Sequence, residues 1–142
     1  MTLVYLGEKN IPGILDLANR KHGQEIYTKE QILSFVGNVN KGNISVGYSI
    51  NNRLSAYIIA FKESGKIKIH DFAWEKPKQF MNFFKEYLVH VGTADIEVYM
   101  CDQGLRIFSR FINNGCTVEI IKTEKCIRYG ETVNKLVIRS TN

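Results

Sequence analysis

One stretch of the chain, residues 66–92, decides the fold: KIKIHDFAW at 66–74, EKP at 75–77 and KQFMNFFKEYLVHVG at 78–92. The first part is rich in alternating and β-branched residues, which is typical of a strand. Pro77 then opens a helix, because the first turn of a helix tolerates a residue without an N–H. Apolar side chains recur along one face of that helix: Phe80, Phe84, Tyr87, Leu88 and Val91. The stretch therefore predicts a strand that runs directly into an amphipathic helix, which ends at Gly92.

Two further helices are predicted before this stretch. The first begins near Asn10, a residue type that commonly caps helices, and carries Pro12 in its first turn. The second runs from Thr28 to Gly37, because Thr28 and Gln31 form a T-x-x-Q capping box.

A meander of strands is predicted between these helices and the strand at 66–74. Residues 44–50 alternate apolar with polar or small residues, as a half-buried strand does. Residues 53–62 form a nearly continuous apolar run, which indicates a central strand buried on both faces. Asn51 and Asn52 lie between the two strands and predict a tight hairpin turn, because Asn tolerates positive φ.

The end of the chain predicts a strand, a helix and two more strands. The first strand covers residues 96–100, and Asp102 is expected to cap the helix that follows. The last two strands lie near residues 117–128 and 132–139. We therefore expect residues 1–142 to form a single mixed α/β domain of the α+β type.

Composition narrows the class of protein. The chain has 142 residues, of which 44% are hydrophobic, and a chain of this size can bury roughly two thirds of its unfolded surface. No apolar run approaches the ~20 residues that span a bilayer, and the first residues lack the features of a signal peptide. Cys101, Cys116 and Cys126 predict reduced, buried thiols in a cytoplasmic protein. No spacing of residues suggests a metal site.

The formal net charge of +5 favours an acidic partner or a phosphate-bearing ligand. The lysines are spread along the chain and form no basic run, and no nucleic-acid-binding motif is present. We therefore do not expect nucleic acid to be the partner.

The order of elements resembles the Gcn5-related N-acetyltransferase (GNAT) fold over nearly the whole chain. The resemblance implies a mixed, mainly antiparallel central sheet flanked by four helices. In GNAT enzymes the strand before the central helix splays from its neighbour, and acetyl-CoA enters the gap. The resemblance therefore implies a V-shaped cleft between the strands at 66–74 and 95–100.

The loop that holds the pyrophosphate of acetyl-CoA in GNAT enzymes, Q/R-x-x-G-x-G/A, is absent. The corresponding stretch, residues 71–80, contains no glycine, and Pro77 removes an amide donor from the helix start. If acetyl-CoA binds, the resemblance implies contacts from the strand edge and two nearby cations: Phe72, Ala73, Trp74, Lys76 and Lys78. The alternative is that both lysines are solvated side chains at a helix start.

The general base and the general acid of GNAT enzymes have only partial counterparts in this sequence. A general base in GNAT enzymes is often a carboxylate beside this loop, and Asp71 and Glu75 are the candidates here. Alternatively, Glu75 complements the helix dipole and Asp71 has no role. The tyrosine that protonates the CoA thiolate falls on Phe111 when the chain is aligned on Gly115, and phenylalanine cannot act as an acid. His70 is expected to be a half-buried, hydrogen-bonded histidine.

The second half of the chain is also similar in pattern to the GNAT-like internal virion proteins of T7-like phages. The similar segments are KPKQFMNFFKEY at 76–87 and IFSRFINNGC at 107–116. This resemblance would place the chain in a virion or in the cytoplasm of a host cell.

Two functions follow from these observations. In the first, the chain is a non-catalytic GNAT-fold protein that needs no cofactor and binds another protein, with Trp74 and Phe83 as candidate interface anchors. In the second, it is a diverged acyl-CoA N-acyltransferase that moves an acetyl group from acetyl-CoA to an amine, with Asp71 or Glu75 as base. The absence of both the glycine loop and the tyrosine favours the first. The identity of a protein partner, and whether the chain forms a homo-oligomer, stay open.

Overall fold

The computed structural model describes residues 2–23, 25–37, 42–91, 95–113, 118–128 and 130–140. Within these ranges the chain order is β1 (Thr2–Tyr5), a short 3-10 helix η1 (Glu8–Asn10), α1 (Ile11–His22), α2 (Lys29–Val36), β2 (Val46–Ile50), β3 (Arg53–Glu63), β4 (Lys66–Trp74), α3 (Pro77–Val91), β5 (Asp95–Met100), α4 (Asp102–Asn113), β6 (Val118–Arg128) and β7 (Glu131–Ser140).

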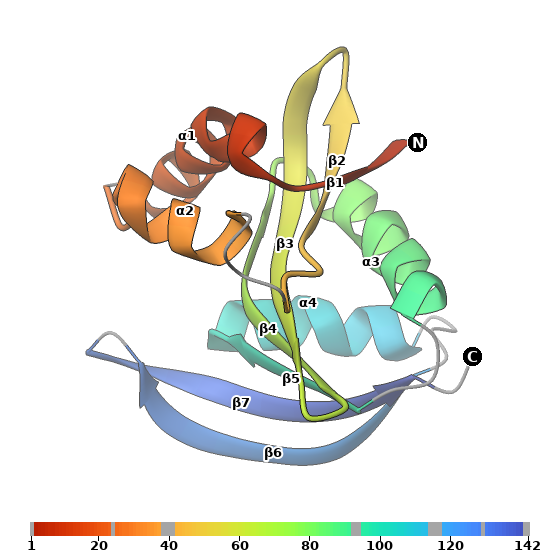
Figure 1. The fold of residues 1–142 in the computed structure, drawn as a ribbon. Helices are drawn as coiled ribbons and strands as arrows, with labels where there is room; N and C mark the ends of the chain where they lie inside the picture. Colours follow the sequence, from red (N-terminus) through yellow and green to blue (C-terminus); the bar gives the residue numbers. More distant parts are fainter. Residues whose placement is uncertain are drawn as a thin grey trace.

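The strands form one sheet in the order β1-β2-β3-β4-β5-β7-β6. Every neighbouring pair is antiparallel except β4 and β5, which run parallel. Helices α1 and α2 lie on one face of the sheet, and α3 and α4 lie on the other (Figure 1). Side chains of α1 and α2 belong to one hydrophobic core, and side chains of α3 and α4 belong to the other. The predicted mainly antiparallel sheet flanked by four helices is therefore confirmed.

The capping box predicted for α2 is confirmed. The Thr28 hydroxyl accepts the Gln31 N–H at 3.1 Å, and the Gln31 side chain accepts the Thr28 N–H at 2.7 Å. Asn10 occupies the N-cap position of α1, as predicted, but its side chain makes no capping hydrogen bond there and instead accepts the Gly7 N–H. Asp102 is the first residue of α4, whose first backbone hydrogen bond is accepted by the Cys101 carbonyl. The cap position predicted for Asn10 is therefore confirmed, and the cap predicted for Asp102 was wrong.

The central hairpin agrees with its prediction. Asn51 and Asn52 have φ angles of 52° and 63°, as a tight turn between β2 and β3 requires. Six consecutive residues of β3, from 55 to 60, are buried. Because successive strand side chains point to opposite faces, β3 contributes to both cores.

Two predictions about burial were wrong. Phe83 is fully buried in the core beneath α3, so it is not an interface anchor. Cys101 is exposed and Cys126 half-buried, although both were expected to be buried. Cys116, Gly92 and Gly115 lie outside the described residues. No helix in the described part of the chain is long and apolar enough to cross a membrane.

One polar atom in the core beneath α3 carries an energetic penalty. Tyr87 is fully buried, and its hydroxyl has no hydrogen-bond partner among the described residues. Burial raises the pKa of Tyr87, because the phenolate is poorly solvated there. A buried hydroxyl without a partner costs about 1–3 kcal/mol.

We expect the substitution Tyr87→Phe to stabilise the protein by about 1 kcal/mol, because it removes the unpaired hydroxyl and keeps the packed ring. Urea unfolding of the two proteins measures the difference. The matched control is Tyr57→Phe, which removes a buried hydroxyl that does donate a hydrogen bond and should lower stability. A loss of stability in Tyr87→Phe would contradict this assignment.

Candidate functional site

The site begins where β4 and β5 separate. The two strands pair over only three positions, and the last of these joins Ile69 to Val98. Beyond this point β4 continues to Trp74 and β5 to Met100 without pairing with each other. A cleft of about 480 Å³ opens between them, which lies in the size range of ligand sites. The V-shaped cleft expected between these strands is therefore present.

A β-bulge sets the direction of the side chains along the open part of β4. Ile69 pairs with Ala60 and Asp71 pairs with Ile59, so His70 has no opposite residue on β3. An extra residue shifts the alternation of a strand by one position. As a result His70 and Asp71 both lie on the face covered by α1 and α2, where the His70 ring packs against Phe35 and Asp71 contacts Tyr57.

The backbone of β4 has a free edge along the cleft. The Glu75 N–H donates to the Ser55 carbonyl at 2.9 Å, so this opposite pair is hydrogen-bonded. Hydrogen-bonded and non-hydrogen-bonded pairs alternate in an antiparallel ladder, which makes Trp74 with Ala56 and Phe72 with Ile58 non-hydrogen-bonded pairs. The N–H and C=O groups of Phe72 and Trp74 therefore point away from β3, toward the side from which β5 has separated.

The carboxylate of Asp71 and the phenol of Tyr27 line the polar side of the cleft, and the buried phenol of Tyr57 contacts Asp71 from the core. The Oδ2 atom of Asp71 accepts hydrogen bonds from the Tyr57 hydroxyl at 2.8 Å and the Tyr27 hydroxyl at 3.0 Å. Burial, and then the charge of Asp71, raise the pKa of Tyr57 well above its usual value. The phenol therefore stays protonated and donates, and its hydrogen bond favours the charged form of the carboxylate.

A neutral histidine and an arginine lie at the rim of the cleft. The Nη2 atom of Arg128 lies 2.8 Å from Nδ1 of His70. A guanidinium only donates hydrogen bonds, so Nδ1 accepts and the ring proton is on Nε2. Burial, and then the charge of Arg128, lower the pKa of His70 to about 4. His70 is thus uncharged at neutral pH. It is half-buried and hydrogen-bonded, as predicted from the sequence. Arg128 also lies over the Tyr99 ring, 4.3 Å from its centre.

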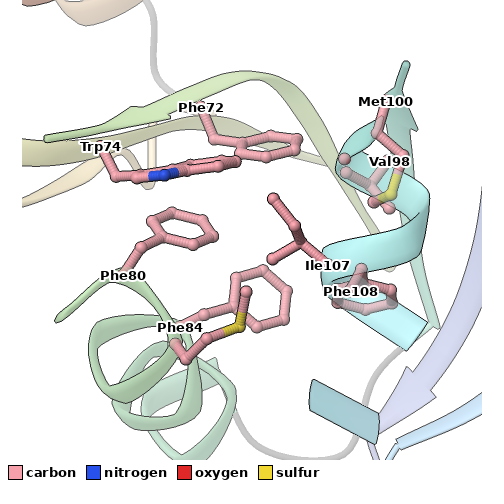
Figure 2. A pocket seen from close by; sticks show the side chains of 10 residues that line it. Phe72, Trp74, Phe80, Phe84, Val98, Met100, Ile107 and Phe108 are labelled. Carbon is pink, nitrogen blue, oxygen red and sulfur yellow. The ribbon is translucent and has the colours of Figure 1, made fainter. Parts of the chain in front are cut away.

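The opposite wall of the cleft is apolar. Figure 2 shows the rings of Phe72 and Trp74 side by side above Phe80. The centres of these rings are 4.7–5.8 Å apart, and the angles between their planes are 14–30°. The Nζ atom of Lys21 lies 4.9 Å from the centre of the Trp74 ring. The cleft therefore passes through the sheet, from polar groups on the α1 and α2 face to aromatic groups on the α3 and α4 face.

The structure places the predicted site residues in two groups. The four residues on β4 line the cleft: Asp71, Phe72, Ala73 and Trp74. The remaining three lie at the start of α3 and do not line it: Glu75, Lys76 and Lys78.

The residues at the start of α3 have different surroundings. The carboxylate of Glu75 forms ion pairs with Arg20 at 3.2 Å and Arg53 at 3.5 Å. Lys76 and Lys78 are exposed on either side of Pro77, and Pro77 does line the cleft. Their proposed roles stay predictions, and of the two carboxylates only Asp71 lines the cleft.

Two residues of the cleft, Tyr27 and Arg128, and the buried Tyr57 that contacts Asp71 were not identified from the sequence. Tyr27 lies in the segment before α2, Tyr57 lies in an apolar run that indicated only core, and Arg128 lies at the end of β6. None belongs to a local motif, and each meets Asp71 or His70 only because the fold brings distant segments together. Phe111 is a residue of α4, but its side chain is outside the described part of the structure. In the described ranges no group of His, Cys, Asp and Glu side chains could hold a metal ion.

No family model matches the sequence, and no curated protein sequence matches it. Solved structures do match the fold. A probable acetyltransferase from Staphylococcus epidermidis has a TM-score of 0.74 and 12% identity, covering 99% of this chain and 99% of that chain. Ard1 from Thermoplasma volcanium has a TM-score of 0.70 and 13% identity, covering 99% and 98%. The PaiA N-acetyltransferase from Thermoplasma acidophilum, solved in complex with coenzyme A, has a TM-score of 0.60 and 13% identity, covering 94% and 96%.

Because these sequence identities are low, the matches are evidence for the fold alone. The matches cover nearly all of both chains, and the separation of β4 from β5 is the feature that the GNAT resemblance implied. The chain has the fold of the GNAT acetyltransferases.

Proposed function

We propose that this chain is a diverged acyl-CoA N-acyltransferase, which binds an acyl-CoA in the cleft and transfers the acyl group to an amine. The observation that carries the proposal is the free edge of β4 at Phe72 and Trp74, open to a cleft of about 480 Å³. The pantetheine arm of CoA is an extended chain with two amide groups. Such a chain can pair with a free strand edge as a further strand would.

The phosphate end of the donor would lie at the start of α3. Helix N-termini favour phosphate through free N–H groups and the helix dipole, and α3 has 15 residues. Lys76 and Lys78 supply charge there, and Lys21 lies at the same end of the cleft. These three cations take the place of the missing glycine loop, so we expect weaker binding than a full amide cradle gives.

The amine would approach from the opposite face, beside Asp71. Its nitrogen attacks the thioester carbonyl carbon, so that a C–N bond forms and the C–S bond breaks. Asp71 accepts the proton that the amine loses, and Tyr27 and Tyr57 hold the carboxylate in place. The departing CoA thiolate takes its proton from solvent, since the family tyrosine position falls on Phe111.

The exposed edge strand β6 favours a second function, the binding of another protein chain. β6 is an edge strand of the sheet, and three of its isoleucines are exposed by 39–78%: Ile120, Ile121 and Ile127. An exposed edge strand is a template for pairing with another chain. In this second proposal the chain is a non-catalytic protein that binds a protein partner or a second copy of itself through β6.

Binding of acetyl-CoA separates the two proposals. A ligand at 100 times its dissociation constant adds about 2.7 kcal/mol of stability, so thermal unfolding should shift upward by several degrees. The double substitution Lys76→Ala/Lys78→Ala should weaken binding, whereas the control Lys62→Ala/Lys85→Ala, which removes two exposed lysines outside the cleft, should not. No shift at millimolar acetyl-CoA, with a dimer or larger species in sedimentation, would favour the edge-strand function.

Release of the CoA thiol in the presence of small amines and peptide amino-termini tests the transfer itself. We expect Asp71→Asn to reduce the rate at least tenfold, the usual scale of general-base catalysis being about 100-fold or more. Its affinity for acetyl-CoA should stay within twofold of the unsubstituted protein, because the amide can still accept from both tyrosines. An unchanged rate would remove Asp71 from the mechanism.

A further inference from the structure

An apolar recess continues the cleft beneath the sheet, between β4, α3 and α4. All ten residues that line it are hydrophobic or glycine. It shares the side chains of Phe72, Trp74, Met100 and Ile107 with the cleft, so the two are continuous. Val98, the last residue of β5 that pairs with β4, also lines the recess. The recess therefore begins at the vertex where the two strands separate.

The vertex is where the proposed donor presents its thioester. With the phosphates at the start of α3, the pantetheine arm runs along the edge of β4 from Trp74 past Phe72 toward Ile69 and Val98. The polar groups at that end, Asp71 and His70, lie on the α1 and α2 face. The apolar recess lies on the opposite face. The acyl chain can therefore extend from the vertex into apolar surroundings, on the face opposite to the amine.

We infer that the donor carries an acyl group longer than acetyl, whose apolar chain lies in this recess beside Phe72, Phe80 and Ile107. The inference rests on the proposed acyl transfer and names its donor class as short- to medium-chain acyl-CoA. An acetyl group would end at the vertex and would not reach the apolar side chains of the recess. A polar or charged acyl group would find no hydrogen-bonding side chain there.

The recess is nearly filled in the free protein. Its volume is about 10 Å³, the room of at most one water molecule, so an acyl chain can enter only if the side chains that line it move. Figure 2 shows Ile107 projecting from α4 between the rings of Phe72 and Phe80 and the side chains of Val98 and Met100. Ile107 and Met81 are half-buried, and methionine fills irregular spaces and repacks readily. Rotation of these two side chains is the movement that would admit a longer chain.

The test is the affinity of the unsubstituted protein for acetyl-, butyryl- and hexanoyl-CoA, measured by isothermal titration calorimetry. Each buried methylene strengthens binding about fourfold before the work of moving Ile107 is subtracted. We expect hexanoyl-CoA to bind at least ten times more tightly than acetyl-CoA. Ile107→Ala should increase this ratio, and Ile107→Phe should abolish it.

The control is Ile127→Phe, which makes the same change at a site on β6 that is 78% exposed, and which should keep the ratio. Equal affinities for the three donors would overturn the inference and leave the proposed function intact. A failure of all three donors to bind would overturn the proposed function and the inference with it. The series with unsubstituted protein decides both, even if an Ile107 variant does not fold.

Discussion

The short parallel contact between β4 and β5 is the constraint on which the rest of the site depends. Three residue pairs hold the two halves of the sheet together, and the strands then separate. Each half is anchored elsewhere, because β4 pairs with β3 over eight positions and β5 pairs with β7 over six. The gap can therefore stay open without loss of the fold. It exposes the backbone of one strand and connects the two faces of the sheet.

The bulge at His70 determines which side chains of β4 lie on each face of this gap. Without the extra residue, Asp71 would share the face of Ile67 and Ile69 and would be buried among the apolar side chains beneath α3 and α4. With it, Asp71 meets two phenols on the opposite face, and Phe72 is directed to the aromatic side. Burying an unpaired carboxylate would cost several kcal/mol, so the bulge is a condition of stability as well as of function. One inserted residue thus separates a polar wall from an apolar one.

The sequence predicts the elements of this fold well, because each is encoded by local patterns. The buried run of β3, the turn at Asn51 and Asn52 and the helical stripe from Phe80 all depend on neighbours in the chain. The bulge leaves no such pattern, so the alternation through His70 could not be assigned. The partners of Asp71 come from distant segments: Tyr57 looks like core, and Tyr27 lies in a connection. Asn10 and Asp102 were assigned as caps from residue type alone. Asn10 does occupy the cap position of α1, but its side chain accepts from Gly7, and the Asp102 carboxylate accepts from Asn134.

The central claim is that β4 offers a free strand edge on which an acyl-CoA donor binds. Amide hydrogen exchange, resolved by residue with NMR, tests it most directly. In the free protein the amides of Phe72 and Trp74 should exchange much faster than those of Ala73 and Glu75, which point toward β3. Saturating acyl-CoA should slow the exchange at Phe72 and Trp74 and leave Ala73 and Glu75 unchanged. Equal protection of all four amides in the free protein, or no change on adding the donor, would contradict the account.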